Sequence, residues 1–215
     1  MSPFPLILSA PSGTGKTTIA KELLRVRSDV GYSVSCTTRA PRDGEVEGQD
    51  YYFLERQEFL ARRTRGNFAE SAEVHGNLYG TLRSEVERVL QSGRHVMMDI
   101  DVQGATQFRS AFPDSVLVFI LPPSADVLLE RLRRRGTENR GELAARMISA
   151  LQELRAVPEY EYVVVNDRLE KAVARVSAVI DAEFVRRARM SSLDKDMEAL
   201  VSRLECELEN DLPKE

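Results

Sequence analysis

The segment A-P-S-G-T-G-K-T, residues 10–17, contains the residue types that a phosphate chain requires. Gly13 and Gly15 let successive backbone N–H groups point at phosphate oxygens without a clash from a Cβ atom. Lys16 adds a mobile positive charge, and the hydroxyl of Thr17 is an oxygen ligand that Mg²⁺ accepts. The order of these residues matches the P-loop pattern that ends in G-K-S/T. The segment therefore predicts a nucleotide phosphate site.

The neighbouring sequence supports this prediction. The apolar run 4–10 predicts a buried strand, and residues 16–27 have apolar positions near helical spacing. A helix that starts at the loop adds its positive N-terminal end to the site. Ala10 stands where the pattern has its first glycine, and we expect a small residue to suffice there. The predicted phosphate-binding set is Ser12, Gly13, Thr14, Gly15, Lys16, Thr17 and Thr18.

A second acidic or hydroxyl ligand for Mg²⁺ is expected at the end of a neighbouring strand. Residues 95–100, HVMMDI, form an apolar strand that ends in acid. Asp99 is placed as the Walker B type of acid that accompanies a P-loop. We therefore predict Thr17 and Asp99 as the metal ligands.

A second cluster could bind another phosphate group. Residues 35–42 read S-C-T-T-R-A-P-R, in which Arg39 and Arg42 flank Pro41. Two guanidinium groups suit a phosphate monoester dianion because each can donate paired hydrogen bonds. Hydroxyl donors for the same anion are predicted at Ser35, Tyr51 and Tyr79. Since the P-loop already provides for a phosphoryl donor, this cluster indicates the acceptor.

Three further polar residues could read a nucleobase. Carboxylates such as Glu70 and Asp101 prefer a base that carries N–H donors, and guanine offers N1–H and N2–H₂. The hydroxyl of Thr81 could donate to guanine O6. Together these residues would select guanine over adenine, although their spacing alone cannot show that they meet.

The apolar pattern predicts an α/β fold. Four continuous apolar runs alternate with helical segments, as expected for a parallel sheet that is buried on both faces. The runs are 4–10, 95–100, 116–121 and 162–165, and the expected helices are 16–27, 84–93, 124–135, 142–157 and 168–189. Shorter strand-like pieces are expected at 33–36, 51–54 and 68–82, with a polar segment at 55–67.

The domain organisation follows from where this alternation holds and where it fails. The predicted core is 1–32 with 95–123 and 142–189, and the stretch 33–94 reads as an inserted lobe. Residues 124–141 are predicted to form a lid. The acidic stretch 190–215 is predicted to be a tail helix that is either docked or solvated.

Composition limits the class of protein. The chain has 215 residues with a formal net charge of −4, which argues against a general nucleic-acid binder. No apolar stretch is long enough to span a membrane. The two cysteines, Cys36 and Cys206, make no disulfide framework, so a cytoplasmic location is expected.

The motifs together resemble those of the guanylate kinases. The matching stretches are SAPSGTGKT, SVSCTTRAPRDGEVEGQDYYF, FAESAEVHGNLYGT, MMDIDVQG, FILPPS, ERLRRRGTE and VVND. They run through residues 6–167 in family order. The resemblance implies a P-loop NTPase-type core with an inserted nucleoside-monophosphate-binding lobe and a lid. It also implies ATP and Mg²⁺ as cofactors, and GMP or dGMP as the acceptor.

The resemblance assigns roles to individual residues. Ser35, Arg39, Arg42, Tyr51 and Tyr79 would hold the phosphate of GMP, and Glu70, Thr81 and Asp101 would bind its base. Asn166 matches a residue near the adenine of ATP. Lys16, Arg42, Arg135 and Arg146 would stabilise the charge on the transferring phosphoryl group, the last two as arginines of the lid.

Two other functions compete with this one. A sugar-phosphate kinase on the same scaffold would need no guanine reader such as Glu70 or Asp101. A binding module without nucleotide chemistry would not need the complete GTGKT sequence or the lid arginines. The sequence does not determine the oligomeric state, for which a homodimer is one alternative.

Overall fold

The computed structural model describes residues 2–74, 76–134 and 140–211. Its centre is a five-stranded sheet in the order β2-β7-β1-β8-β9, and every pair of neighbours is parallel. The strands are β1 (Pro5–Ser9), β2 (Val30–Tyr32), β7 (His95–Asp99), β8 (Val116–Leu121) and β9 (Tyr162–Val165). Parallel strands place all their carboxyl ends at one edge, where ligands bind in this class of sheet.

Helices cover both faces of the sheet. Leu6 and Leu8 of β1 point to the face covered by α1 (Lys16–Val26) and α7 (Leu169–Phe184), whereas Ile7 points to the other face. That second face is covered by α3 (Arg83–Gln91) and α4 (Val102–Ala111). The continuous apolar runs of the strands follow from this double burial, and the α/β fold class is confirmed.

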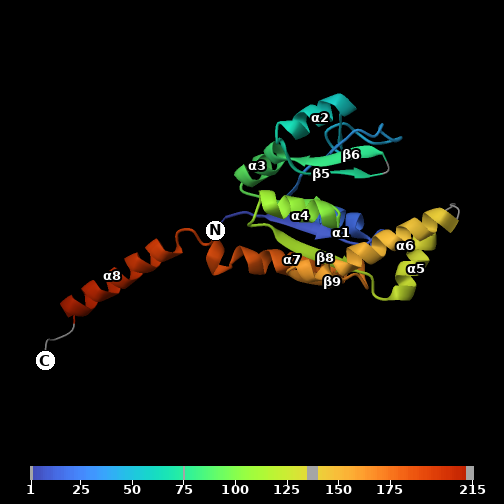
Figure 1. Ribbon diagram of the computed structural model, residues 1–215. Coiled ribbons are helices and arrows are strands. Elements are labelled where there is room, and N and C mark those ends of the chain that lie inside the picture. The colour runs from blue at the N-terminus through green and yellow to red at the C-terminus, as the bar shows by residue number, and fades with distance from the viewer. Residues whose placement is uncertain (1, 75, 135–139, 212–215) are drawn as a thin grey trace.

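The segment between β2 and β7 builds a second sheet, in the order β4-β3-β6-β5, on one side of the core in Figure 1. Its strands are β3 (Cys36–Thr37), β4 (Tyr52–Phe53), β5 (Phe68–Val74) and β6 (Asn77–Leu82). A helix, α2 (Arg56–Thr64), packs on it through Phe59, whose ring stacks on Phe68 at a centroid distance of 4.4 Å.

Two further helices form an arm beside the core sheet. Helices α5 (Ala125–Arg134) and α6 (Arg140–Arg155) pack on each other through Leu128, Leu132 and Ala150, and the short 3₁₀ turn η1 (Val157–Glu159) leads into β9. The described part of the predicted lid, 124–134 and 140–141, includes α5 and the start of α6.

The structure differs from the sequence expectations in three details. The strand expected at 33–36 is two elements, β2 and β3, because the chain leaves the core sheet after Tyr32 and joins the second sheet at Cys36. The polar segment 55–67 contains α2, whose described residues bury only Phe59. The helix expected to reach residue 189 ends at Phe184.

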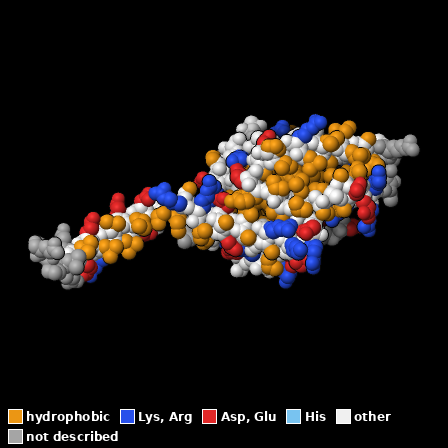
Figure 2. Space-filling view, turned by 90° about the horizontal axis from the view of Figure 1, so that it is seen from below, with side chains coloured by type: hydrophobic (Ala, Val, Ile, Leu, Met, Phe, Trp, Pro, Cys, Tyr) orange, Lys and Arg blue, Asp and Glu red, His pale blue; other side chains and the backbone are white. Residues whose placement is uncertain are grey.

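The C-terminal helix α8 (Leu193–Asp211) extends away from the body (Figure 1). Its large apolar side chains are exposed and lie along one stretch of the helix in Figure 2, namely Met197, Leu200, Val201, Leu204 and Leu208. The body of the same chain therefore does not cover these side chains. No helix among the described residues combines the length and the apolar character needed to cross a membrane.

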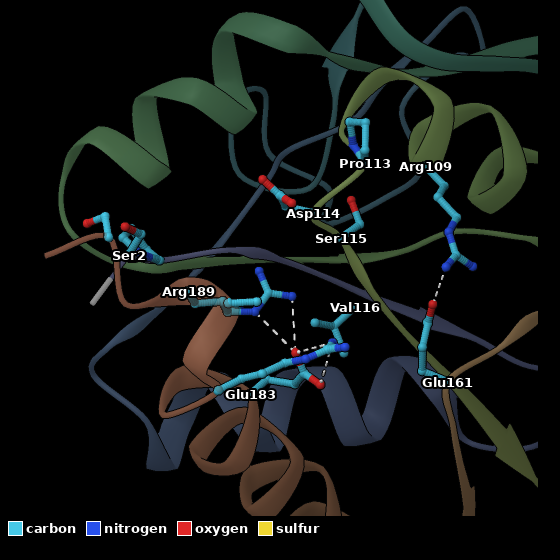
Figure 3. Close-up of a pocket in the computed structure, with 13 residues that line it drawn as sticks. Ser2, Arg109, Pro113, Asp114, Ser115, Val116, Glu161, Glu183 and Arg189 are labelled. Atoms are coloured by element: carbon cyan, nitrogen blue, oxygen red, sulfur yellow. Dashed lines mark hydrogen bonds and ion pairs between the residues drawn. The ribbon is translucent and has the colours of Figure 1, made fainter. Parts of the chain in front are cut away.

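A cluster at the amino edge of the sheet fixes the point from which α8 departs. Figure 3 shows the cavity there, about 440 Å³, with Glu183 at its base. Glu183 accepts hydrogen bonds from Arg189 Nε at 3.1 Å and from the Tyr162 hydroxyl at 2.6 Å. The Arg189 guanidinium also lies over the ring of Phe4, 4.4 Å from its centroid. The buried Glu183–Arg189 pair thus ties the turn before α8 to the core.

Candidate active site

The P-loop follows β1 and wraps around the start of α1, as predicted. Gly13 and Gly15 have φ angles of 85° and 90°, which favour glycine, and Gly15 is the N-cap of α1. A Cβ atom on Gly15 would also lie 2.7 Å from Nδ2 of Asn166. The loop therefore requires glycine there for both its conformation and its packing.

The carbonyl of Thr14 anchors the loop to the rest of the core. It accepts hydrogen bonds from Asn166 Nδ2 at 2.7 Å and from Arg131 at 3.3 Å. The side chain of Asn166 is buried, and its hydrogen bond to the Thr14 carbonyl holds the P-loop in position. Beside it lies a cavity of about 440 Å³ that Arg134 and Leu169 also line. Asn166 thus lies beside the P-loop, as expected for a residue near the donor nucleotide. Its amide nitrogen already donates to the Thr14 carbonyl.

Thr17 and Asp99 meet at the carboxyl edge of the sheet. The Thr17 hydroxyl donates to one carboxylate oxygen of Asp99 at 3.0 Å, and the Tyr32 hydroxyl donates to the other at 2.7 Å. Lys16 Nζ donates to the carbonyl of Ile100 at 3.0 Å, so it lies beside the same strand end. Hydroxyl and carboxylate oxygens are ligands that suit Mg²⁺. No group of three or more acidic, histidine or cysteine ligands occurs among the described residues.

The predicted second anion site is organised by a residue that the sequence analysis missed. Glu45 accepts a hydrogen bond from Arg39 at 2.8 Å and another from the backbone N–H of Arg42 at 2.8 Å. The Arg39 guanidinium lies 5.5 Å from the centroid of the Tyr51 ring. Arg39 is thereby held in place, whereas the Arg42 residue is exposed.

The other predicted phosphate ligands line one cavity with two of the three residues that were predicted to bind guanine. Its volume is about 200 Å³, and it includes Ser35, Tyr51, Tyr79, Glu70 and Asp101. The rings of Tyr51 and Tyr79 meet edge to face at a centroid distance of 6.1 Å. Asp99 and Tyr32 also line this cavity, which therefore adjoins the Thr17–Asp99 pair.

Glu70 and Thr81 are paired across the β5–β6 ladder. The Thr81 hydroxyl donates to Glu70 Oε1 at 2.7 Å. A hydroxyl has one proton, so in this arrangement Thr81 orients Glu70, and the expected donation to guanine O6 is not available at the same time. Burial raises the pKa of the Glu70 carboxyl to about 7, and the nearby charge of Asp101 acts in the same direction.

Asp101 begins α4 and caps it. Its carboxylate accepts from the backbone N–H of Gly104 at 2.7 Å. A Cβ atom on Gly104 would lie 3.1 Å from Glu70 Oε2, so glycine permits α4 to approach the β5 carboxylate closely. The two acids predicted to read one base therefore lie at one place, brought together by the contact of α4 with β5.

The structure describes one of the two arginines that were predicted to belong to the lid. Arg146 lies on α6. Arg135 lies outside the described residues. Arg134, its neighbour, is exposed and pairs with Glu130 at 3.8 Å.

Comparisons with known proteins agree with this geometry. A sequence model of the family described as guanylate kinase matches residues 2–183. The chain belongs to the guanylate kinase family. The guanylate kinase of Clostridium perfringens strain SM101 is 45% identical over 185 residues, 86% of each chain. That of Thermotoga maritima is 44% identical over 85% of this chain and 88% of its own.

A solved structure is similar along most of its length. The guanylate kinase from Anaplasma phagocytophilum superposes with a TM-score of 0.76 at 37% identity, covering 92% of this chain and 95% of that one. The resemblance drawn from the sequence motifs is confirmed, and so is the prediction of an enzyme of the guanylate kinase class. The individual residue roles stay predictions.

Proposed function

We propose that this chain transfers the γ-phosphoryl group of ATP to GMP, giving ADP and GDP. One observation carries the proposal beyond family membership. Asp99 accepts a hydrogen bond from Thr17 of the P-loop and also lines the cavity that contains Glu70, Tyr51 and Tyr79. A nucleotide phosphate on the P-loop and an acceptor in that cavity would therefore adjoin one another.

The donor side would be ATP with Mg²⁺. Backbone N–H groups of residues 12–18 and the ammonium of Lys16 would bind the phosphates. Thr17 and Asp99 would hold Mg²⁺, since their oxygens already meet at the strand edge. The ion would supply positive charge against the phosphoryl oxygens.

The acceptor side would be GMP, and dGMP as well. Arg39, Arg42, Ser35, Tyr51 and Tyr79 would bind its phosphate. An ionised Glu70 would accept from guanine N1–H and N2–H₂, and Asp101 would accept from the same edge of the base. Thr81 would contribute by orienting Glu70.

The proposed mechanism needs neither a general base nor a covalent intermediate. A phosphate oxygen of GMP would attack the γ-phosphorus in line, so the protein supplies positioning and positive charge. Lys16, Arg42, Arg135 and Arg146 would stabilise the charge of the transferring group. Closure of the lobe 33–94 and the lid 124–141 would exclude water, a competing acceptor.

The test is ADP release from ATP and Mg²⁺ in the presence of GMP, with Glu70→Gln as the comparison variant. The proposal predicts GMP-dependent turnover by the wild type and a raised KM for GMP in the variant. ADP release that does not depend on GMP would contradict it. We further propose a cytoplasmic location, a reducing setting that suits a chain whose Cys36 and Cys206 form no disulfide in the structure.

We also propose that the chain forms a homodimer through α8. The helix carries seven acidic and two basic residues, so it does not fit an anionic membrane surface. The partner surface in this proposal is the edge strand β9, whose Val163 and Val165 are exposed. Arg175 borders these valines and donates to the carbonyl of Val165 at 2.8 Å. The acidic, apolar helix of one copy would cover this edge in the other.

Light scattering on the eluting protein tests the dimer. The wild type is expected to have twice the mass of the chain, and the double variant Leu200→Glu, Leu204→Glu is expected to have the mass of one chain. A Lys195→Glu variant, which adds acid away from the apolar stripe, is the matched control. A monomeric wild type at micromolar concentration would overturn the assembly without affecting the proposed reaction.

A further inference from the structure

Glu153 is a partly buried acid beside the P-loop that the sequence analysis did not identify. It lies on α6 and lines a hollow of about 240 Å³ whose other lining residues are 10–18, the P-loop itself. Its carboxylate oxygen Oε2 is buried and has no hydrogen-bond partner in the part of the chain that the structure describes. A buried oxygen without a hydrogen-bond partner lowers the stability of the fold, so its presence here indicates a function for Glu153.

A negative charge on Glu153 would be unfavourable when phosphate is bound to the P-loop. The P-loop binds anions, and an ionised carboxylate in the same hollow would repel the phosphate oxygens. When two acids share a site, the proton is retained by one of them. A neutral carboxylic acid has an O–H group and can donate to a phosphate oxygen, which the ionised form cannot do.

We propose that Glu153 binds the nucleotide as the neutral acid and donates a hydrogen bond from its carboxyl O–H to a phosphate oxygen of ATP. The proton comes from solvent as ATP binds and returns to solvent when the nucleotide leaves. Glu153 is thereby a phosphate-binding residue of the donor site. The inference rests on the proposed function, in that the P-loop holds the phosphates of ATP.

The surroundings of Glu153 favour this protonation. Burial raises the pKa of its carboxyl to about 7, against the opposing effects of Lys16 and of the backbone N–H of Ser12. Asp101, at the start of α4, raises it further. Tyr160, after η1, also interacts with Glu153, and burial raises the Tyr160 pKa to about 12, so the phenol stays neutral at pH 7–9. Added phosphate charge acts in the direction that favours the proton.

The experiment is titration calorimetry of ATP binding, without GMP and with EDTA, between pH 7.0 and 8.5. Terminal phosphates have a pKa of about 6, so ATP is almost fully ionised in the upper part of this range. Buffers with different ionisation enthalpies report the protons taken up. We expect the wild type to take up close to one proton at pH 8, and its affinity to fall about tenfold from pH 7.0 to 8.5.

The variants separate this role from a structural one. Glu153→Gln resembles the neutral acid in shape and keeps a donor, so it should bind ATP with no proton uptake and little pH dependence. It should therefore bind more tightly than the wild type at pH 8.5. Glu153→Met lacks a donor and should bind more weakly than Glu153→Gln at every pH. Glu130→Gln removes an exposed acid from α5 and should keep the wild-type profile.

Each alternative result overturns the inference in a distinct way. If wild-type affinity is flat across the range, or if Glu153→Gln falls with pH as the wild type does, Glu153 is not the proton-binding group. If Glu153→Met binds as well as Glu153→Gln, no hydrogen bond to phosphate exists. If the wild type fails to bind ATP at any pH, the proposed donor site is overturned together with the inference.

Discussion

The hydroxyl oxygen of Thr17 lies 3.0 Å from a carboxylate oxygen of Asp99, although 82 positions separate the two residues in the chain. The parallel pairing of β1 with β7 produces this contact, because it brings the P-loop and the end of β7 to the same edge of the sheet. The contact joins the donor side of the site to the acceptor cavity, which Asp99 also lines.

Thr17→Val should remove one proposed Mg²⁺ ligand while keeping the shape of the side chain. We expect kcat/KM for Mg-ATP to fall by at least about 100-fold, the upper end of the losses seen for residues one shell further from a metal. Thr17→Ser keeps the hydroxyl and is the control. Steady-state rates across a Mg²⁺ titration measure both. Equal Mg²⁺ dependence in Thr17→Val and the wild type would remove Thr17 from the metal site.

The P-loop should tolerate a glycine at one position and reject an alanine at another. Ala10→Gly should leave ATP affinity nearly unchanged, because residue 10 is a buried small side chain at the end of β1. Gly15→Ala should weaken ATP binding strongly, because its φ of 90° and its contact with Asn166 both disfavour a Cβ atom. Calorimetric titration with ATP compares the two. A large gain in affinity for Ala10→Gly would show that alanine distorts the loop.

The affinity for GMP should rise with pH through about 7. Glu70 must be ionised to accept from guanine N–H groups, and its pKa is raised to about 7 by burial. The phosphate of GMP has a pKa of about 6 and titrates in both proteins, so the comparison with Glu70→Gln isolates the effect of the Glu70 carboxyl. We expect KM for GMP to fall between pH 6.5 and 8 in the wild type and to stay nearly level in the variant. Parallel profiles would show that Glu70 does not titrate on binding.

Stability should change with pH in the direction set by Glu70, which is buried, and Glu153, which is partly buried. The folded-state pKa values of Glu70 and Glu153 are about 7, above the ordinary value of 4.5. The folded state therefore binds more protons than the unfolded state between these pH values, and the free energy of unfolding falls as pH rises from about 4.5 to about 7.

Urea unfolding at pH 4 and pH 8 checks this sign. Glu153→Gln should be more stable than the wild type at pH 8, by about 1 kcal/mol because solvent screens the partly exposed carboxylate, and should lose that advantage at pH 4. Exposed Glu130→Gln should show no such difference between the two pH values. An advantage of Glu153→Gln that is equal at both pH values would assign the effect to packing.

Arg135→Ala should reduce kcat by about 10³-fold or more while ATP affinity stays close to that of the wild type, as for arginines that engage the transferring group. Arg134→Ala removes an exposed neighbour and is the matched control. Single-turnover rates and ATP titrations separate the two effects. An unchanged kcat would exclude Arg135 from the mechanism.

The sequence predicted the parts of the fold that carry strong apolar patterns. β1, β7 and β8 are apolar runs buried in the sheet, β9 is an apolar edge strand that is partly exposed, and each was expected near its observed position. α2 was missed because its sequence, RQEFLARRT, offers almost no apolar periodicity, and its one fully buried side chain is Phe59. The strands around Cys36 are two residues long, too short to carry a pattern.

The site was predicted where chemistry follows from local sequence and missed where it depends on tertiary contacts. The glycines of the P-loop act through their own backbone, so spacing alone indicates them. Glu45 is six residues from Arg39 in a run of charged residues, and only the fold shows that it pairs with that guanidinium. Glu153 is distant in sequence from the P-loop and carries no motif of its own, so its position became visible only through the packing of α6.

The most direct test of the account is a competition in which the enzyme, ATP and Mg²⁺ meet equal concentrations of GMP, AMP, CMP and UMP, with the diphosphates separated and measured at early time. The account predicts that GDP accumulates and that ADP forms in equal amount, with no CDP or UDP above background. Preferential formation of CDP or UDP, or release of phosphate with no GDP in folded protein that binds both nucleotides, would contradict it.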